Sequence, residues 1–533
     1  QLQNLHPEDK SFLRGEYQPK SLELGLGDIG VLFHNFPKLS AGGLSGWTFE
    51  LIKRSFNFKN EELMQNLVLF LNRFLDGSMS AQHIWMRGKL IPLAKNSEDP
   101  KAGIRPIVVA EVWIRMISRF VMMRIGNALH DVLVPHQFGV HVKGGVEVGA
   151  HILSRMVEYV KIDDARDMEI FSIDIKNAFG SMHRAAIEKE ILKRFPKAAN
   201  YFYFCYDIAA PLYCNGSYVT SSKRGVFQGD PMGPGWFALG LSPIIKQVAL
   251  EFPEIDIFGY LDDTYLTGNR DKISEAIRES LVLRLEEIGL EVNWAKGWRL
   301  ASESTEVRKA LGVPLAMDRN YIKDFVENKL QKIMEKMDFI SSNYPVEYSL
   351  PLLSGSVNHC CQYLARVLPP DELVQNLFNE FDLAMDASIA RLVSYHSTSL
   401  PEVSKLIRHL PYRHGGLGIS RMARINPMAW SASYLAAKYW VEKNWPRGSQ
   451  LALAIAFTEG FPNVRTVQQD SESDPSASSS NLSADAVDPE DLDVALDAVD
   501  PEDLDEREKA VMEPPKEMEF VEADNKIVKK LIL

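Results

Sequence analysis

The sequence lacks the features that are typical of secreted proteins, membrane-spanning proteins and proteins with structural zinc sites. Among its 533 residues there are four cysteines, which show neither a disulfide framework nor the paired spacing of a zinc site: Cys205, Cys214, Cys360 and Cys361. Such sparse cysteine use predicts a reducing, intracellular compartment, nuclear or cytoplasmic. No apolar run reaches the roughly 18–20 residues of a membrane span. Gln1 opens the chain without a secretory pattern, which predicts a fragment or a processed piece.

An excess of basic residues is also missing, because the formal net charge is −12. The acidity is confined to one segment. Residues 466–533 hold 20 acidic and 6 basic residues, a net charge of −14, whereas the remaining residues hold 51 acidic and 53 basic ones, a net charge of +2. A nearly neutral body can still bind a phosphate backbone through a local basic groove. The charge balance therefore does not exclude a nucleic-acid enzyme.

Two adjacent acids, Asp262 and Asp263, stand between two apolar runs. Residues 255–259 precede them and residues 264–267 follow, which predicts a strand–turn–strand hairpin with both carboxylates at its tip. Neighbouring carboxylates repel each other unless a cation lies between them, and their oxygens suit Mg²⁺. A pair of acids alone is weak support, since Asp163 and Asp164 lie in a polar stretch that predicts only a solvated turn.

A third acid strengthens the prediction. Asp174 ends the short apolar strand expected over residues 170–173, so it could join the hairpin acids on one surface. Three such carboxylates could hold two Mg²⁺ ions about 3.5–4 Å apart, the arrangement that clamps the attacking and leaving oxygens in phosphoryl transfer. Between these acids, residues 224–234 are rich in glycine and proline, which predicts a tight loop that a sugar or base can approach closely.

In this order, the motifs resemble the palm of reverse transcriptases: Asp174-x-x-x-Ala178-Phe179, then Gln228-Gly229-Asp230-Pro231, then Tyr260-x-Asp262-Asp263. The surrounding chain resembles the non-LTR (LINE-type) retrotransposon branch. Further segments are similar to that branch's N-terminal extension, its fingers strands, its segment between fingers and palm, and its last two palm motifs, in that order: residues 40–47; 90–95 with 105–107; 136–139 with 144–145; and 289–296 with 311–312. The resemblance runs from about residue 40 to 315 and continues more faintly to about 437.

The resemblance implies an RNA-directed DNA polymerase that extends a primer 3′-OH with deoxynucleotides by two-metal-ion nucleotidyl transfer. Its implied partners are an RNA template, a DNA primer and deoxynucleoside triphosphates, and its implied cofactor is two Mg²⁺ ions, with Mn²⁺ as an alternative. The implied metal ligands and catalytic acids are Asp174, Asp262 and Asp263. Lys296 would protonate the departing pyrophosphate. The implied nucleotide-binding residues are Lys95, Arg105, Phe179, Gln228 and Gly229.

Each role has a structural alternative. Asp174 alone would be a helix N-cap, Phe179 a core aromatic, Gln228 the cap of a turn and Lys296 a surface lysine. In the family, the ring at the position of Phe179 excludes a ribose 2′-hydroxyl, the group that distinguishes RNA precursors from DNA precursors. Arg105 would neutralise the triphosphate with a bidentate fork. Lys95 would assist, although Lys89 or Lys101 could serve in its place.

The expected fold is α+β, a right-hand polymerase with fingers, a palm built on an antiparallel sheet and a helical thumb. We expect a helical N-terminal extension (1–85), fingers (86–169), palm (170–320), a helical thumb and post-thumb region (321–465) and an acidic, largely disordered tail (466–533), with the reverse transcriptase domain as a whole at about 75–320. The tail contains a 12-residue repeat starting at Asp485 and Asp497. The main expected helices span 61–75, 112–130, 182–195, 236–252, 273–289, 324–340, 347–367, 371–395 and 427–442. Cys360 and Cys361 are expected to be packed.

Three hypotheses follow. The first is the active polymerase described above. The second is an RNA-dependent RNA polymerase, against which Phe179 and the loop at Gln228 argue. The third is a decayed or domesticated element protein that binds nucleic acid without catalysis, against which the intact acid triad argues. The sequence shows no zinc-knuckle pattern or recognisable endonuclease motif, so we expect that this chain cannot complete a transposition cycle alone.

Overall fold

The structure is a computed structural model that describes residues 3–7, 17–56, 59–95, 103–162, 167–393 and 402–444. The chain divides into two units, Gln1–Ala454 and Ile455–Leu533, and all of the described residues belong to the first. The acidic repeat segment from residue 466 and the Asp163–Asp164 pair lie outside the described residues. Within the described part of the chain, no helix combines the length and apolar character that crossing a bilayer would demand.

A four-stranded antiparallel sheet carries the predicted acids. Its strand order is β6-β7-β3-β8, with β6 at Asp256–Tyr260, β7 at Asp263–Asn269, β3 at Met168–Ile173 and β8 at Trp298–Ala301. Strands β6 and β7 pair as the predicted hairpin, and Tyr260 lies opposite Asp263 at its tip. Strand β3 then pairs with β7 from Met168 opposite Asn269 to Ile173 opposite Thr264. The predicted palm sheet is confirmed.

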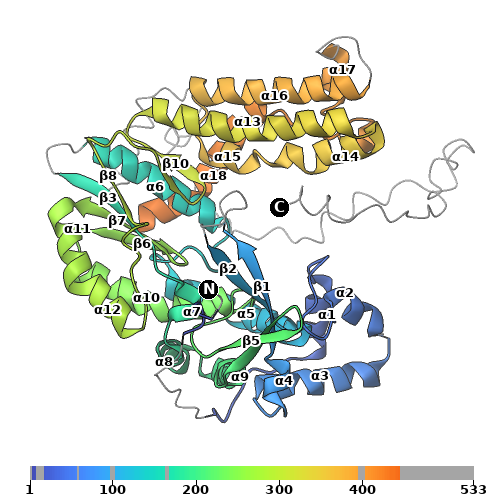
Figure 1. Cartoon of the computed structure of the whole chain (residues 1–533), viewed down its shortest axis with the longest axis vertical. Helices are drawn as coiled ribbons and strands as arrows, with labels where there is room; N and C mark the ends of the chain where they lie inside the picture. Colours follow the sequence, from blue (N-terminus) through green and yellow to red (C-terminus); the bar gives the residue numbers. More distant parts are fainter. Residues whose placement is uncertain are drawn as a thin grey trace, which may run out of the picture. The chain divides into compact units, whose positions relative to one another are not determined.

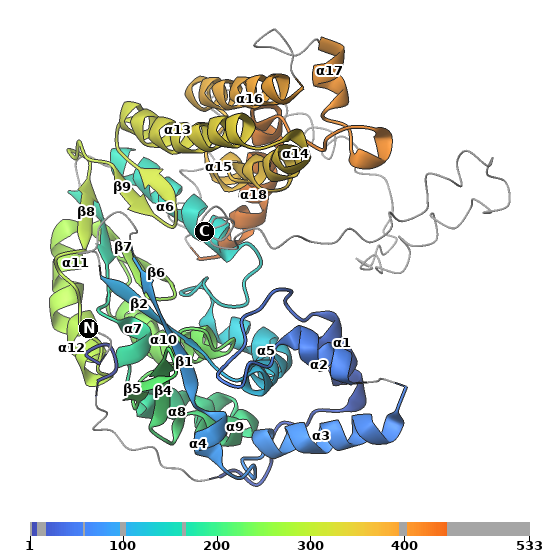
Figure 2. The ribbon, with the colours of Figure 1, turned by 45° about the vertical axis from the view of Figure 1, so that its right-hand side comes forward.

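Both faces of this sheet are buried, because alternate residues point into different cores. Phe171, Ile173 and Leu266 belong to a core shared with helices α10 (Gly233–Glu251) and α11 (Arg270–Ala276). Ile170 and Tyr265 belong to a second core, shared with helix α6 (Gly145–Ile162). Figure 2 shows α11 along this sheet. Every residue of β3 is accordingly buried, including the polar Glu169 and Ser172.

A second four-stranded sheet joins two distant parts of the sequence. Its order is β2-β1-β4-β5, with β1 at Gly88–Ala94, β2 at Ile104–Val109, β4 at Ala210–Cys214 and β5 at Ser217–Ser222. Strand β1 pairs antiparallel with β2 and parallel with β4. Strands from the predicted fingers therefore share a sheet with a hairpin that lies inside the predicted palm segment. The hairpin turn is Asn215-Gly216, a strong turn signal that the sequence analysis did not use.

A further set of helices contributes to one large hydrophobic core that also includes Leu90 of β1 and Val108 of β2. The N-terminal helices are α1 (Leu26–His34), α2 (Phe49–Ser55), α3 (Glu61–Leu75) and α4 (Gln82–Trp85). Helix α3 has the predicted bounds: the Asn60 side chain caps it by accepting the Leu63 N–H, and Leu67, Leu71 and Phe74 are buried on one face. The remaining helices of this region are α5 (Val112–Leu133), α7 (Ala178–Ser181), α8 (Arg184–Arg194), α9 (Ala199–Tyr206) and α12 (Val282–Glu287).

After residue 318 the described chain is helical, as predicted (Figure 1). These helices are α13 (Arg319–Asn343), α14 (Val346–Gly355), α15 (Gln362–Val367), α16 (Glu372–Leu392), α17 (Glu402–Ile407) and α18 (Met422–Asn444). Helices α13, α14 and α16 pack together around a core of their own.

One expected helix is wrong. The helix predicted over residues 347–367 is divided into α14 and α15 by the 3-10 turn Val357–His359. The turn buries Asn358, whose side-chain oxygen accepts the N–H of Ser420 at 3.1 Å. The break also follows Ser354-Gly355-Ser356, residues of low helix propensity, so a local stop signal and this tertiary contact act together. The interruption also leaves Cys360 exposed while Cys361 is buried, so the expectation that both are packed is wrong for Cys360.

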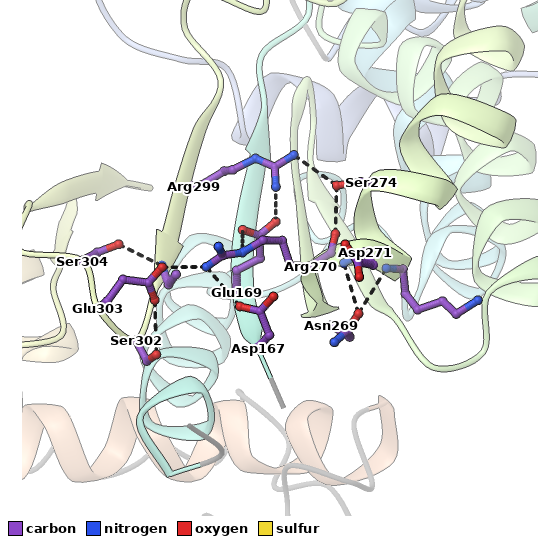
Figure 3. A network of polar contacts seen from close by, with 12 residues as sticks. Asp167, Glu169, Asn269, Arg270, Asp271, Ser274, Arg299, Ser302, Glu303 and Ser304 are labelled. Atoms are coloured by element: carbon purple, nitrogen blue, oxygen red, sulfur yellow. Dashed lines mark hydrogen bonds and ion pairs between the residues drawn. The ribbon is translucent and has the colours of Figure 1, made fainter. Parts of the chain in front are cut away.

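A polar network ties the sheet together at the end of β3 far from Asp174 (Figure 3). Glu169 is 1% exposed, and its carboxylate lies 2.6 Å from Arg299 Nη1 on β8 and 3.5 Å from Arg270 Nε at the start of α11. Burial raises the Glu169 pKa, and the two guanidinium groups oppose that shift. The guanidinium of Arg299 also lies over the Phe171 ring, 4.7 Å from its centroid. Ion pairs thus connect β3, β8 and α11 at this end of the sheet.

The contact between α6 and α18 is expected to weaken below neutral pH. His151 on α6 is buried; its Nε2 lies 2.9 Å from Ser433 Oγ, and its ring contacts Tyr434. Burial, aided by the charge of Arg155, lowers the His151 pKa to about 4. The folded state therefore binds the proton more weakly than the unfolded state does, so stability is complete above pH 6.5 and falls as the pH drops toward 4. We expect a loss of about 2 kcal/mol between pH 7 and pH 5 from this group.

Thermal unfolding measured from pH 7.5 to pH 5 checks this expectation. The variant His151→Gln, which keeps a polar side chain without a titrating ring, should show a shallower pH dependence than the parent. Equal slopes for the two proteins would contradict the assignment to His151.

Candidate active site

The strand register brings the predicted acids to one edge of the antiparallel sheet. Ile173 lies opposite Thr264, so the next residue, Asp174, leaves β3 across from Asp263 at the start of β7. Asp262 lies in the two-residue turn between β6 and β7. Residues that lie opposite each other share a face of the sheet. The position of Asp174 is thus fixed by the same ladder that fixes the hairpin.

The electrostatics agree with this proximity. Burial raises the pKa of Asp262, and the charge of Asp174 raises it further, while Arg105 and Lys296 lower it. Burial also raises the pKa of Asp263 to about 6, and the charges of Asp262 and Asp174 add to that shift. Crowded, partly desolvated carboxylates of this kind would be stabilised by a bound cation.

Asp174 is held by the segment that follows Gly289. The Asn293 side-chain nitrogen donates to Asp174 Oδ2 at 2.8 Å, and the Asn293 backbone N–H donates to the Asp174 carbonyl at 2.8 Å. Lys296 Nζ lies 3.7 Å from Asp174 Oδ2, with 56% of its side chain exposed. Sequence reasoning placed Asn293 in a motif without assigning it a role. Its spacing before Lys296 was the only signal available.

The two predicted triphosphate ligands lie on one hairpin: Arg105 is within β2, and Lys95 follows the end of β1. Arg105 is exposed on β2, opposite Leu93, and its positive charge lowers the pKa of Asp262. Lys95 is exposed beyond the end of β1, and its backbone N–H donates to the Gly103 carbonyl at 3.0 Å. The structure therefore brings Arg105 to the acids. For Lys95 the nucleotide contact stays a prediction to which the geometry adds nothing.

The loop at Gln228 is fastened to the same strand as Arg105. The Val108 N–H on β2 donates to the Gln228 carbonyl at 2.9 Å. Gly229 has φ +131°, and a Cβ atom there would lie 2.4 Å from the Val108 carbonyl oxygen, so only glycine fits this approach. The Gln228 side chain is half-buried and Gly229 is exposed. Both predicted residues thus lie beside β2, while their contact with a nucleotide stays a prediction.

A buried polar cluster supports this loop from behind. Asp230 is 4% exposed; it accepts the Tyr206 hydroxyl at 2.6 Å and the Met232 N–H at 3.1 Å. Burial raises the Asp230 pKa, and hydrogen bonds from Ser118 and Tyr206 oppose the shift. Asp230 therefore faces the protein interior, which separates it from the three acids of the sheet edge.

A buried arginine fixes the chain on both sides of this cluster. Arg184 is 4% exposed and donates to the carbonyl oxygens of Gly225 at 3.0 Å, Tyr206 at 2.7 Å and Ser222 at 3.1 Å. Its guanidinium also lies over the Tyr206 ring, 5.3 Å from its centroid. Arg184 thereby joins α8, α9 and β5 to the segment that leads into the Gln228 loop.

Phe179 is packed on one side. Its ring stacks on Phe237 of α10, with centroids 4.7 Å apart and an interplanar angle of 27°. Its carbonyl accepts the Val226 N–H at 2.8 Å, which links it to the segment leading to Gln228. The side chain is half-buried. This geometry fits a rigid wall beside the site, and it also fits the core role that the sequence left open.

The three acids supply the donor chemistry of a divalent metal site, because carboxylate oxygens are the ligands that hard cations prefer. As the side chains stand, no group of three or more His, Cys, Asp or Glu residues in the described ranges is arranged to hold a metal ion. Asp174 instead engages Asn293 and Lys296. The three carboxylates and their position at one edge of the sheet fit a metal ion. In the described residues, however, their side chains do not converge on a common point.

Comparison with known proteins gives a family match for the central part of the chain. Residues 93–315 match the family model described as "Reverse transcriptase (RNA-dependent DNA polymerase)". The chain is 22% identical over 412 residues to the Retrotransposable element SLACS 132 kDa protein of Trypanosoma brucei gambiense, a match that covers 72% of this chain and 32% of that protein. The chain thus spans about a third of the length of this curated relative.

Among solved structures, the chain is similar to apo telomerase from Candida tropicalis, with 14% identity, a TM-score of 0.39, and coverage of 69% of this chain and 66% of that one. It is also similar to telomerase from Candida albicans in complex with a TWJ fragment of telomeric RNA, with 13% identity, a TM-score of 0.39, and coverage of 72% and 66%.

The match indicates that residues 93–315 form a reverse transcriptase domain, the domain of RNA-directed DNA polymerases, which are nucleotidyltransferases. The predicted resemblance to a reverse transcriptase of the non-LTR retrotransposon kind is confirmed by this match together with the retrotransposable-element relative. Reverse transcriptase domains use divalent metal ions.

Proposed function

We propose that this chain is an active RNA-directed DNA polymerase that extends a primer 3′-OH with deoxynucleotides. The observation that carries the proposal is the register of β3 and β7, which sets Asp174 across from Asp263 beside the turn that holds Asp262. Nucleotidyl transfer would need acids at one edge because they would hold the divalent cations that stabilise negative charge on the attacking and leaving oxygens. The match of residues 93–315 supports the same chemistry.

Asp174, Asp262 and Asp263 would hold two Mg²⁺ ions, with Mn²⁺ as an alternative. Bound there, divalent ions supply the clamp on the attacking and leaving oxygens. The protein's own contribution is to crowd three carboxylates at one edge and to orient Asp174 through Asn293. The Asp263 pKa of about 6 means that this acid is mostly ionised at neutral pH, as a metal ligand must be.

The basic side chains near the acids would have separate roles. Arg105, whose charge reaches Asp262, would neutralise the incoming triphosphate, and its planar fork suits phosphate oxygens. Lys296 is exposed and lies 3.7 Å from Asp174, so its ammonium can move to the departing pyrophosphate and donate a proton there. The partners of the reaction would be an RNA template, a DNA primer and deoxynucleoside triphosphates.

Sugar selection is expected to depend on Phe179. Because its ring is fixed by Phe237, it forms a wall that cannot swing away from a 2′-hydroxyl. Replacing Phe179 with valine should raise ribonucleotide incorporation relative to deoxynucleotide incorporation by roughly tenfold or more, since the discriminated group adds a clash worth about 1–3 kcal/mol. The measurement is the ratio of kcat/KM for matched dNTP and NTP in single-nucleotide extension.

The matched control is Phe237→Leu, which loosens the wall without removing the ring at position 179. It should change the ratio less than Phe179→Val does. An unchanged ratio in Phe179→Val would assign Phe179 to the core and remove the main argument against an RNA polymerase.

One assay tests the function as a whole. The purified chain is given a generic RNA template annealed to a DNA primer, with Mg²⁺ and either dNTPs or NTPs. Extension with dNTPs supports the proposal. Preference for NTPs would favour an RNA-dependent RNA polymerase, and template binding without extension would favour a decayed or domesticated element protein.

A further inference from the structure

A buried glutamine contacts the turn that carries Asp262. Gln137 is 3% exposed and lies in the segment that joins α5 to α6. Its side-chain Oε1 accepts the Leu261 backbone N–H at 2.6 Å, and its Nε2 donates to the Leu261 carbonyl at 3.1 Å. One side chain thus satisfies both backbone groups of a single residue 124 positions away.

That residue has an unfavourable backbone conformation. Leu261 has φ +57°, in the left-handed region that costs a residue with a Cβ atom roughly 1–2 kcal/mol. It directly precedes Asp262 and Asp263, so its backbone angles set the direction in which both acids leave the turn. The closing pair of the β6–β7 ladder, Tyr260 with Asp263, leaves a two-residue turn that favours a positive φ at its first residue, and because leucine carries a Cβ atom the strain remains for other contacts to offset.

The rest of the segment holds Gln137 in place. Strand β6 is at the edge of its sheet, and residues 136–138 run along it: Phe138 N–H donates to the Gly259 carbonyl at 3.0 Å, and Gly259 N–H donates to the His136 carbonyl at 2.8 Å. The Gly139 N–H donates to Gln137 Oε1 at 3.0 Å, which fixes the amide orientation.

Space at the turn is equally restricted. A Cβ atom at Gly139 would lie 2.7 Å from Leu261 Cγ and 2.8 Å from Leu261 N. The segment therefore approaches the turn as closely as backbone can, and the Gln137 amide has one orientation in which it reaches both Leu261 groups.

We propose that Gln137 is a positioning residue for the reaction: it holds Leu261 in the left-handed conformation and thereby aims Asp262 and Asp263. The catalytic effect that we infer rests on the proposed polymerase function. The contact between Gln137 and Leu261 is independent of that function. Gln137 touches no reacting atom. Its effect passes through the Leu261 backbone to the two acids.

The test compares Gln137→Met with the parent protein. Methionine keeps the volume and removes both hydrogen-bonding groups. In primer extension we expect kcat to fall roughly 10–100-fold, as for a catalytic group displaced by about 1 Å, while KM for template–primer stays unchanged. Gln65→Met is the matched control: Gln65 is exposed on α3, where its amide contacts Glu61, and the substitution should change neither constant.

A second variant separates positioning from simple structural loss. Glycine adopts the left-handed conformation without steric cost, so Leu261→Gly should make the enzyme less dependent on Gln137. We expect the double variant to recover part of the kcat lost in Gln137→Met, a non-additive result. Additive losses would overturn the proposal, because they would mean that the two residues act separately.

Hydrogen exchange provides a readout that does not depend on activity, and its first part needs only the parent protein. In the parent protein the Leu261 amide should exchange slowly although it lies in a two-residue turn, and it should exchange faster in Gln137→Met while β3 amides are unchanged. Fast exchange of Leu261 in the parent would overturn the contact. A parent that extends no primer would overturn the polymerase function while leaving the exchange result intact. Full activity of Gln137→Met would overturn the positioning role alone.

Discussion

Asp174→Asn is expected to reduce primer extension by at least about 100-fold, more than the loss usual for a group that only supports a metal ligand. The substitution removes a charged ligand but keeps an oxygen that can accept the Asn293 side-chain N–H, so the local structure should persist. Affinity for template–primer should not fall, because Asp174 contributes no positive charge to a nucleic-acid groove. Extension rate and filter binding on the same preparation measure the two effects.

The control is Asp131→Asn, the same change at an exposed acid on α5. It should leave extension unaffected. If Asp174→Asn kept parental activity, neither the metal ligand role of Asp174 nor the two-metal proposal could stand.

Arg184→Met is expected to destabilise the fold by roughly 3 kcal/mol or more, since it leaves several buried carbonyl oxygens without a donor. Those of Gly225, Tyr206 and Ser222 lie in three different segments, so their separation should loosen the support of the Gln228 loop. A loss of this size corresponds to a fall in Tm of several degrees. Arg184→Lys should not restore the parental Tm, because a single ammonium cannot reproduce the planar fork.

Arg278→Ala is the matched control, as its side chain is 72% exposed and pairs only loosely with Glu279 at 3.8 Å. Its Tm should equal that of the parent. A parental Tm for Arg184→Met would show that water or neighbouring groups replace the guanidinium without cost.

The parts of the site that sequence could predict are those with local signals. The hairpin around Asp262 follows from two apolar runs and a turn, and the strand before Asp174 follows from a short, mainly apolar run, residues 170–173, that is followed by an acid. Because antiparallel neighbours put strand ends at a common edge, the meeting of these acids could be expected before any coordinates were known.

The polar contacts that the sequence could not predict are those that a neutral amide side chain makes with a residue far away in the chain. Asn293 and Asp174 are 119 positions apart, and Gln137 and Leu261 are 124 positions apart. No periodicity or charge pairing links such residues, since an amide can bind any backbone or carboxylate that it meets. The parallel pairing of β1 with β4 was missed for the same reason, although the Asn215-Gly216 turn marks the hairpin itself.

The break between α14 and α15 belongs to a third kind, in which a local signal was present but outweighed by the apolar spacing of residues 347–367. Ser354-Gly355-Ser356 favours the end of a helix, and α14 ends at Gly355. The contact of Asn358 with Ser420, by contrast, depends on the packing of the later chain.

The ladder between β3 and β7 restricts where insertions and deletions in the sequence can be tolerated. Deleting one residue within β3 would move Asp174 to the opposite face of the sheet, and deleting two would restore the face but shift the acid by about 6.8 Å along the strand. Neither deletion replaces an acidic residue, yet both should abolish primer extension. At Asn215-Gly216, by contrast, an added residue lengthens only an exposed turn and should be tolerated. Insertions and deletions in related chains should therefore gather at such turns and spare the strands beside the acids.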